Sequence, residues 1–497
     1  MLEKCKELIS LWNVNSINYC HWKSNEHLEA GLDGITDLDM FVAPADGDSA
    51  ESLLASIGFI KCVPQKSNQY PNVSEWLGFD EPTGKLIHVH LHFCIITGAK
   101  YCKEFVYPIT DLLLSSRVFD EQTGVYITNP NLEIIILYSR IALKAEDKSH
   151  IYPSKVVEKE ISYLKNQIDN KILFQFCELL LAEKGSALFS IITKSLCDEK
   201  DWEELYRIVN AWLTPYKNMT SASVFIRSHF YKIHYKIVRV LNKKLGRCII
   251  DKKKLPNQGV TVCFLGQDGS GKSTLTVELC EWLGWKLSAK RFYLGSGEHY
   301  NGLLKRISRH KSNKKQYVEH GNNKKDSTEI QTRSKWRLKS LYIAIMFSLE
   351  KCGIAMHTYR EVKRAFQFCN KGGIAVFDRF PQNQFEGLYD GPKIRYFATQ
   401  SGLNYLFVRM LSKLECYYIN KTQVYAPTIV FKLLLSPEES LRRKPFENPN
   451  VVSKKHEITK SLLFPKSHVY EINAEDKYES ELLLIKRIIW RFLLQNQ

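Results

Sequence analysis

The chain has 497 residues, of which 44% are hydrophobic and 25% charged, with a formal net charge of +17 at pH 7. This length exceeds what one hydrophobic core supports, so two or three domains are expected. The composition is typical of a globular protein, and no apolar run reaches the roughly 18 residues that a membrane-spanning helix needs. The positive charge predicts anionic partners: nucleotides, phosphorylated glycans, nucleic acid or anionic lipid.

The 13 cysteines are scattered and never occur in C-x-x-C spacing. This pattern is typical of buried thiols in a reducing compartment rather than of a disulfide frame or a zinc site. The N-terminal residues M-L-E-K begin a polar-apolar helix and lack the hydrophobic region of a secretion signal. The expected location is therefore cytoplasmic.

Residues 1–145 have a mixed α/β pattern whose most informative motif is D-x-D, formed by Asp37 and Asp39. On a strand, positions i and i+2 share a face, so both carboxylates could bind Mg²⁺ against a nucleotide triphosphate. A solvated strand end is the alternative, because D-x-D alone is a weak signal.

A second motif is the alternating segment L-I-H-V-H-L-H-F, which places His88, His90 and His92 on one face of a predicted strand. Imidazole is a common metal ligand. Without cysteine or acidic ligands beside it in the segment, however, the row favours an ordinary exposed or half-buried sheet face over a metal site.

The order of these elements, with a helical tail over 132–144, resembles the nucleotidyltransferase superfamily. In that family a Gly-Ser pair opens the site, D-x-D binds metal, and a third carboxylate comes from a later strand. Here a lysine precedes Ser24, and the later strand offers His90 or His92 in place of the acid. The resemblance therefore implies two alternatives: metal-dependent nucleotidyl transfer, or a repurposed fold that binds a phosphorylated ligand.

Residues 146–250 are predicted to form a helical extension and linker, because apolar residues recur at spacings of three and four. Helices are expected over 156–168, 172–187 and 202–213. A basic amphipathic helix over 222–245 follows, and two alternatives stay open for it. It could lie on a membrane surface, or it could pack its apolar side between domains. A polar segment near residue 250 marks the domain boundary.

Residues 260–274, V-T-V-C-F-L-G-Q-D-G-S-G-K-S-T, combine an apolar strand, a glycine-rich turn and the start of a helix. They contain G-x-x-x-x-G-K-[ST], in which the glycines let backbone N–H groups surround an anion at the N-terminus of the helix. The lysine can reach the outer phosphates and the following hydroxyl can bind Mg²⁺. The predicted ATP-binding residues are Gly266, Asp268, Gly269, Ser270, Gly271, Lys272, Ser273 and Thr274.

Residues 301–340 carry twelve lysines and arginines against three acids. They are predicted to form a charged loop, either solvated or closing on an acidic acceptor, before a long helix over 334–368. The strand over 373–377 then ends in Asp378 and Arg379. Ligands bind beyond the carboxyl ends of strands in an open parallel sheet, so Asp378 is expected to hold Mg²⁺ through water and Arg379 to pair with a phosphate.

A further buried strand over 429–435 leads to S-P-E-E-S-L-R-R, in which Ser436 is a predicted helix N-cap and Pro437 occupies the first turn. Arg442 and Arg443 follow on this helix and could neutralise charge on a transferred phosphoryl group. A last strand over 469–474 and a helix over 479–494 close the chain.

Residues 258–497 resemble the thymidylate kinase branch of P-loop nucleoside monophosphate kinases, through G-Q-D-G-S-G-K-S-T, F-D-R-F, L-L-L-S-P-E-E-S-L-R-R and the terminal E-I-N-A strand. The resemblance implies that Lys272, Ser273 and Thr274 bind ATP phosphates and Mg²⁺. It implies that Asp268 faces a sugar hydroxyl of the acceptor and that Arg379 faces the acceptor phosphate. Arg442 or Arg443 would belong to a lid.

The predicted fold class is α/β: a C-terminal P-loop NTPase parallel sheet flanked by helices (258–497), after an α+β nucleotidyltransferase-like domain (1–145) and a helical segment (146–250). We expect a phosphotransferase that uses ATP and Mg²⁺, with a nucleotide or another anionic small molecule as acceptor. The alternatives are nucleotidyl transfer by the metal-binding pair Asp37 and Asp39, or an inert ATP-binding protein of surface-polysaccharide assembly. Membrane-surface contact and oligomerisation stay open, and nucleic acid is disfavoured because no recognition module is present.

Overall fold

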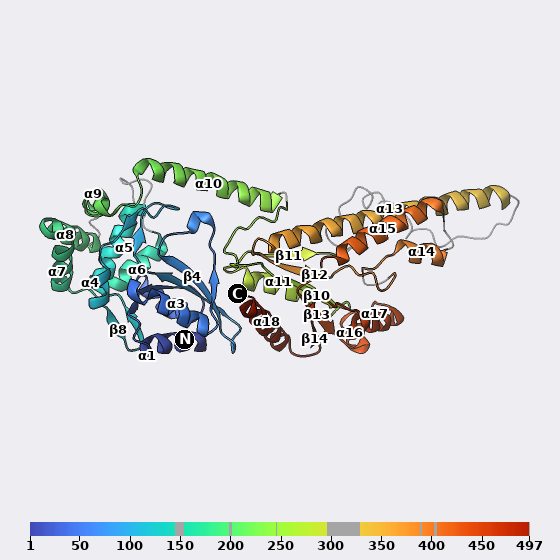
Figure 1. Cartoon of the computed structure of the whole chain (residues 1–497), viewed down its shortest axis with the longest axis horizontal. Helices are drawn as coiled ribbons and strands as arrows, with labels where there is room; N and C mark the ends of the chain where they lie inside the picture. The colour runs from blue at the N-terminus through green and yellow to red at the C-terminus, as the bar shows by residue number, and fades with distance from the viewer. Residues whose placement is uncertain are drawn as a thin grey trace. The chain divides into compact units, whose positions relative to one another are not determined.

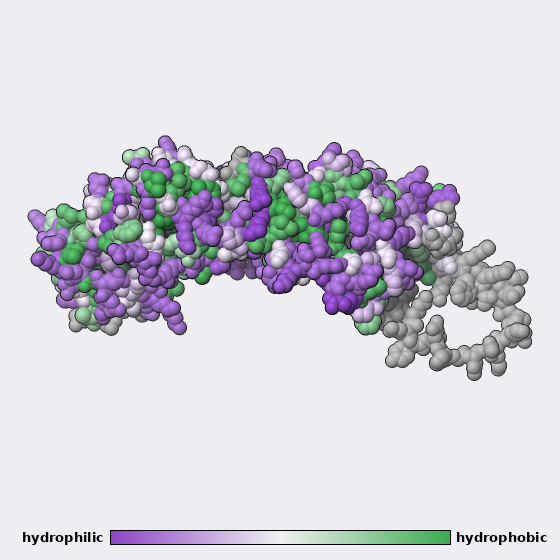
Figure 2. Space-filling view, turned by 90° about the horizontal axis from the view of Figure 1, so that it is seen from below, coloured by the Kyte–Doolittle hydropathy of each residue, from purple (hydrophilic) through white to green (hydrophobic). Residues whose placement is uncertain are grey.

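The computed structural model describes residues 1–144, 154–197, 201–244, 246–295, 329–387, 390–401 and 405–496. It divides into two compact units: unit 1 is Met1–Pro256 with Trp490–Gln497, and unit 2 is Asn257–Ile489. Both units mix helices with a central sheet, as Figure 1 shows. Within the described ranges, every helix is too short or too polar to cross a bilayer. The face seen in Figure 2 is mostly hydrophilic, with scattered hydrophobic residues.

The main sheet of unit 1 has seven strands in the order β3-β4-β5-β2-β1-β9-β8. The strands are β1 (Tyr19–His21), β2 (Asp37–Val42), β3 (Ile60–Cys62), β4 (Val73–Phe79), β5 (Leu86–His92), β8 (Val118–Asp120) and β9 (Val125–Ile127). β2 runs parallel to β5, and β4 runs antiparallel to β5. Leu38 and Met40 of β2 are buried in the core, so Asp37 and Asp39 share the opposite face.

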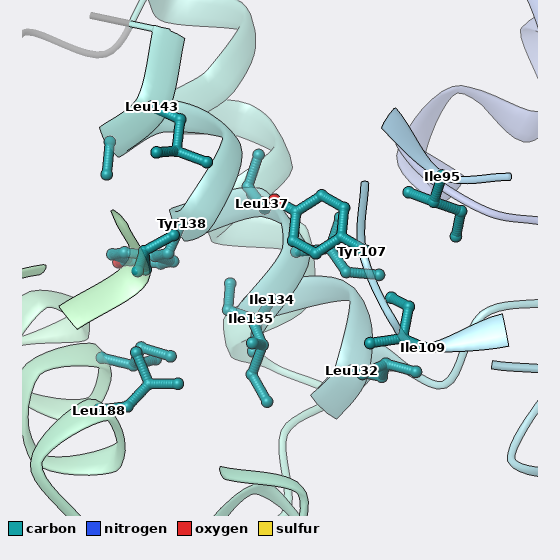
Figure 3. Close-up of a cluster of buried hydrophobic side chains, with 14 of the residues drawn as sticks. Ile95, Tyr107, Ile109, Leu132, Ile134, Ile135, Leu137, Tyr138, Leu143 and Leu188 are labelled. Carbon is teal, nitrogen blue, oxygen red and sulfur yellow. The ribbon is translucent and has the colours of Figure 1, made fainter. Parts of the chain in front are cut away.

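Several helices of unit 1 pack on this sheet or beside it. They are α1 (Glu3–Val14), α2 (Leu28–Leu32), α3 (Gly47–Ser56), α4 (Thr110–Ser115) and α5 (Pro130–Lys144). Helix α5 is buried on nearly every side, and its leucines and isoleucines form the core cluster drawn in Figure 3 together with Tyr107, Ile109 and Leu188. This helix is the helical tail predicted over 132–144, and it anchors the helices that follow it.

The helical middle belongs to the same compact unit as the first sheet. It comprises α6 (Lys155–Lys165), α7 (Asn170–Leu181), α8 (Gly185–Leu196) and α9 (Trp202–Leu213). The single helix predicted over 172–187 was wrong, because the chain turns after Leu181 and a new helix begins at Gly185. A Cβ at Gly185 would lie 2.5 Å from Cα of Glu178, so only glycine permits this close helix-to-helix approach.

The predicted basic helix is α10 (Ser221–Lys244), and much of its apolar side is exposed. Phe225 is 63% exposed and Ile233 is 59% exposed, whereas Val238 on another side is buried. At 100° per residue, Phe230, Ile233 and Ile237 lie on one side of the helix, next to the side that carries Lys236.

Unit 2 contains a five-stranded parallel sheet in the order β11-β12-β10-β13-β14. The strands are β10 (Thr261–Gly266), β11 (Ala289–Tyr293), β12 (Ile374–Asp378), β13 (Ile429–Leu434) and β14 (His468–Asn473). β10 is the first strand in sequence and lies in the middle of the sheet. The chain runs from β10 to β11 and β12 on one side of it, and then crosses to β13 and β14 on the other side. Such a switch point is where open parallel sheets bind ligands.

Helices of unit 2 connect these strands. They are α11 (Lys272–Leu283), α13 (Glu329–Cys369), α14 (Ile394–Ser401), α15 (Leu406–Gln423), α16 (Pro437–Arg443), α17 (Pro449–Ser461) and α18 (Tyr478–Gln495). The long helix predicted over 334–368 is α13. Ser436 caps α16 as predicted, since its side chain accepts a hydrogen bond from the Glu439 backbone N–H. Residues 296–328, most of the predicted basic loop, lie outside the described residues.

Gly259→Ala is expected to destabilise unit 2 more than any neighbouring surface change. A Cβ at Gly259 would lie 1.7 Å from the backbone oxygen of Gly373, so the approach between β10 and β12 would have to widen. Overpacking of this kind costs typically about 1–3 kcal/mol of unfolding free energy. Urea denaturation followed by circular dichroism measures the loss, with exposed Gln258→Ala as the matched control. An unchanged midpoint for Gly259→Ala would contradict the expectation.

Candidate functional site

The loop after β10 adopts a conformation that depends on glycine. Gly269 and Gly271 have φ of +86° and +83°, a region that side-chain-bearing residues rarely adopt. Helix α11 begins directly after Gly271, at Lys272. The loop therefore encloses the N-terminus of α11, where unpaired backbone donors and the helix dipole favour an anion. Thr274 lies exposed in the first turn of α11.

Lys272 lies inside this loop and is only 6% exposed. Its Nζ donates to the Gln267 backbone oxygen at 2.6 Å and to Ser270 Oγ at 3.3 Å. Burial, with the nearby positive charge of Arg379, lowers the pKa of Lys272 to about 8. The ammonium thus occupies the centre of the loop, where both of its hydrogen-bond acceptors among the described residues are neutral oxygens.

Asp378, at the end of β12, lies beside the first turn of α11. Its Oδ2 accepts hydrogen bonds from Ser273 Oγ at 2.8 Å and from an Arg291 nitrogen at 2.6 Å. Its Oδ1 is buried and has no hydrogen-bond partner among the described residues. A carboxylate with an unused oxygen beside a hydroxyl is a donor set that suits Mg²⁺, so these two residues fit the predicted metal site.

Arg379 follows directly and has φ of +73°, a backbone conformation that is costly outside glycine and recurs at functional sites. Its guanidinium lies 3.0 Å from Asp268 Oδ1, and Lys455 of α17 binds the other oxygen of the same carboxylate. Burial alone would raise the pKa of Asp268, but Lys455 and Arg379 lower it to about 2. Two cations thus contact one carboxylate of the glycine-rich loop between β10 and α11.

Arg442 and Arg443, the two arginines predicted for a lid, differ in their exposure and in their contacts. Arg442 is 79% exposed and pairs with Glu439. Arg443 also pairs with Glu439, and it donates to the backbone oxygen of Gly269 at 3.1 Å. Of these two arginines, Arg443 is therefore the one that contacts the glycine-rich loop between β10 and α11.

A cleft lies beyond β11 and β12, next to Arg379. Asp390, on its wall, lies 3.9 Å from the Arg379 guanidinium. Other lining residues come from α13 and α15, and they include Lys351, Thr358, Glu415 and Thr422. Its volume of about 40 Å³ is well below the roughly 300 Å³ of the smallest typical ligand pockets, so a nucleotide-sized acceptor requires it to widen.

The D-x-D motif of unit 1 forms part of a separate polar cluster. Asp37 lies opposite His88 and Asp39 lies opposite His90 across β2 and β5. Glu75 of β4 lies opposite His90 on the far side of β5. Buried His88 lies 2.9 Å from Asp37 through Nδ1 and 2.6 Å from Glu75 through Nε2.

Asp39 has a different set of neighbours. Lys23 Nζ lies 2.9 Å from Asp39 Oδ1, and His90 Nδ1 lies 3.1 Å from the same oxygen. Burial would raise the pKa of Asp39, but Lys23 and the histidines outweigh it and hold that pKa well below its usual range. The histidine row, expected as an ordinary sheet face, is instead surrounded by acids from two neighbouring strands.

Three side chains that contact the candidate sites were not predicted from the sequence: Arg291, Lys455 and Glu75. Arg291 follows a lysine in an amphipathic strand, and Lys455 lies in a mostly polar helix, so neither has a local signal. Glu75 is an acid within the otherwise apolar run V-S-E-W-L-G-F, and this isolation could have identified it.

No family model matches the chain. Two Escherichia coli K12 relatives are described as uncharacterized ATP-binding proteins. YghR is 28% identical over 225 residues, which are 45% of this chain and 83% of YghR. YghS is 24% identical over 224 residues, which are 43% of this chain and 85% of YghS.

Among solved structures, thymidylate kinase from Candida albicans is 14% identical with a TM-score of 0.28, covering 48% of this chain and 92% of that chain. Deoxyadenosine kinase from M. mycoides, solved with bound dATP, is 15% identical with a TM-score of 0.27, covering 46% of this chain and 98% of that chain.

Proposed function

We propose that the chain is an ATP-dependent phosphotransferase whose ATP phosphates bind at the loop between β10 and α11. The observation that carries this proposal is the convergence of Lys272 and the Ser273–Asp378 pair on that loop, at the switch point of a parallel sheet. The description of the E. coli relatives as ATP-binding proteins supports the same assignment.

In this proposal, binding and alignment supply most of the catalysis. Phosphate oxygens replace the Gln267 carbonyl as the acceptor of Lys272 Nζ, while the loop amides donate to them. Ser273 and Asp378 hold Mg²⁺, which when bound neutralises charge on the phosphates. Arg291 fixes the Asp378 carboxylate by its hydrogen bond to Oδ2.

The acceptor is proposed to be an anionic small molecule that binds on the Arg379 side of the loop. Arg379 and Lys455 both bind Asp268 in this structure. An acceptor phosphate would compete with Asp268 for these two cations, and the cleft beside Asp390 would receive the rest of the acceptor. A nucleoside monophosphate such as dTMP is the first acceptor to test.

The test incubates the full chain with ATP, Mg²⁺ and either dTMP or a small-molecule extract of the source cells. Mass spectrometry of the products should show one compound that gains a phosphoryl group as ADP forms. The surface variant Lys371→Ala should behave as wild type, and Lys272→Ala should form far less product than the wild type. Absence of transfer with dTMP and with the extract would contradict the proposal.

ATP binding is expected to take up a proton near pH 8, since the pKa of Lys272 is lowered to about 8 in the ligand-free protein. Phosphates beside the ammonium favour its charged form and raise this pKa, so affinity falls as the pH rises through about 8. Calorimetry at that pH in two buffers of different ionisation enthalpy should show uptake of about half a proton per ATP. Lys272→Arg stays protonated, so equal uptake by this variant would contradict the assignment.

We propose as a second function that α10 binds an anionic lipid surface. The favouring observation is the exposed apolar row of α10, which includes Ile226, Phe230, Ile233 and Ile237, next to its basic side. Co-sedimentation with vesicles containing phosphatidylserine should fall at high salt and in Phe230→Ser/Ile233→Ser. Exposed Leu179→Ser on α7 is the apolar control, and binding equal to wild type in the α10 variant would rule this function out.

A further inference from the structure

The side chains of Asp39, His90 and His92 converge on one point of the unit 1 sheet. One ligand atom of each residue lies within 4.8 Å of the others. Asp39 Oδ1 is 3.1 Å from His90 Nδ1 and 3.7 Å from His92 Nε2. Ligands that each lie roughly 2.0–2.2 Å from a shared ion are themselves about 3.0–3.5 Å apart, so a small contraction completes a coordination shell.

The buried ring of His92 is a second, independent observation that points to a ligand at this cluster. His92 is 4% exposed, yet neither of its ring nitrogens has a hydrogen-bond partner among the residues that the structure describes. A buried imidazole without partners is costly, and native proteins rarely leave one so. The ring packs at 5.1 Å between centroids against Trp22 and at 4.3 Å against His90, which holds Nε2 towards Asp39.

We propose that Asp39, His90 and His92 bind a divalent transition-metal ion, with Zn²⁺ as the reference case. Two imidazoles and one carboxylate suit Zn²⁺ and its first-row neighbours, whereas Mg²⁺ prefers an all-oxygen shell. The ligand set therefore differs from the Asp37–Asp39 pair expected from the D-x-D motif, because Asp37 lies against His88 instead.

Glu75 is not one of the three proposed ligands, but its carboxylate contacts the ligand His90. Its Oε1 lies 3.6 Å from His90 Nε2, the ring nitrogen opposite the one that faces Asp39. A carboxylate on the far nitrogen of a ligating imidazole fixes the tautomer and the ring orientation. Glu75 is thus a positioning residue, and three protein ligands leave coordination positions for water or for an oxygen of a bound molecule.

The positive charge of Lys23 is expected to weaken metal binding at this cluster. Its Nζ lies 2.9 Å from the Asp39 oxygen that also faces both histidines, so its charge competes directly with a metal. Lys23→Met should therefore tighten metal binding. A site in which Lys23 alone neutralised Asp39 would not respond in this way, and it would leave both ring nitrogens of His92 without a hydrogen bond within the described part of the chain.

The experiment titrates the metal-stripped full chain with Co²⁺ in the presence of excess Mg²⁺. The Mg²⁺ occupies sites that offer only oxygen ligands, so Co²⁺ reports on the histidine-containing site. Visible d–d bands should saturate at one equivalent, without the sulfur-to-cobalt charge-transfer band that cysteine ligation produces, and Zn²⁺ should displace the Co²⁺. His90→Ala and His92→Gln should abolish the bands. Glu75→Gln should weaken binding by roughly 10–100-fold, the usual effect of losing an outer partner.

His27→Ala, at a histidine whose side chain is 36% exposed, is the matched control and should titrate as wild type. His90 is 23% exposed, so its variant is the safer of the two for folding, which circular dichroism checks. Bands that survive in both His90→Ala and His92→Gln, or no saturable bands in the wild type, would overturn the proposal. The measurement is independent of phosphoryl transfer, so it fails or succeeds separately from the function proposed for unit 2.

Discussion

Replacing Lys272 by alanine is expected to lower ATP-dependent phosphoryl transfer by roughly 10²–10³-fold or more, the effect of removing one preorganised donor from a reacting oxyanion. The physical reason is the position of Nζ at the centre of the loop, where its acceptors are the Gln267 carbonyl and Ser270 Oγ. Initial rates at saturating ATP measure the loss in the transfer step, and calorimetry measures the loss in ATP affinity.

The fold should survive this change, because the pKa of Lys272 is lowered by burial and its removal relieves a buried charge. Circular dichroism and the urea midpoint check this point. The exposed Lys371→Ala variant controls for a general loss of positive charge. Turnover by Lys272→Ala equal to that of the control would remove Lys272 from the catalytic machinery.

Replacing Arg379 by alanine is expected to cost at least roughly 10³-fold in transfer, the lower range for an arginine that neutralises a transferring phosphoryl group. In contrast to Lys272→Ala, ATP affinity should be largely retained, since Arg379 lies on the proposed acceptor side, where it forms ion pairs with Asp268 and Asp390. Steady-state kinetics with varied acceptor, beside calorimetric ATP binding, separates the two effects.

The matched control is Arg395→Ala, a 72% exposed arginine that pairs with Glu386. Arg379→Lys should recover only part of the activity, because an ammonium cannot bind a phosphate bidentately. If Arg379→Ala weakened ATP binding as strongly as it weakened transfer, Arg379 would belong to the ATP side and the proposed acceptor position would be wrong.

Elements coded by contiguous residues could be predicted from the sequence. The apolar run that becomes β10, the glycine loop after it and the start of α11 follow from one stretch of fifteen residues. The Ser436 cap of α16 is equally local. The close approach of Ser273 and Asp378 could also be expected, because carboxyl ends of parallel strands meet at one edge.

Contacts between distant segments could not be predicted in this way. Lys455 meets Asp268 across 187 positions of sequence, and its own helix shows no motif. The acids that face the histidine row come from β2 and β4, so strand order and register decide which of them lies opposite His90. The split between α7 and α8 depends on a helix-to-helix approach that only the packed structure contains.

The most direct test of the central claim uses ATP labelled separately at the α- and γ-phosphates, with Mg²⁺, dTMP and an extract of the source cells. The account predicts that only the γ label moves to an acceptor, and that Lys272→Ala greatly reduces the movement while Asp39→Asn preserves it. Movement of the α label, lost in Asp39→Asn, would contradict the account and assign the chemistry to the D-x-D sheet of unit 1.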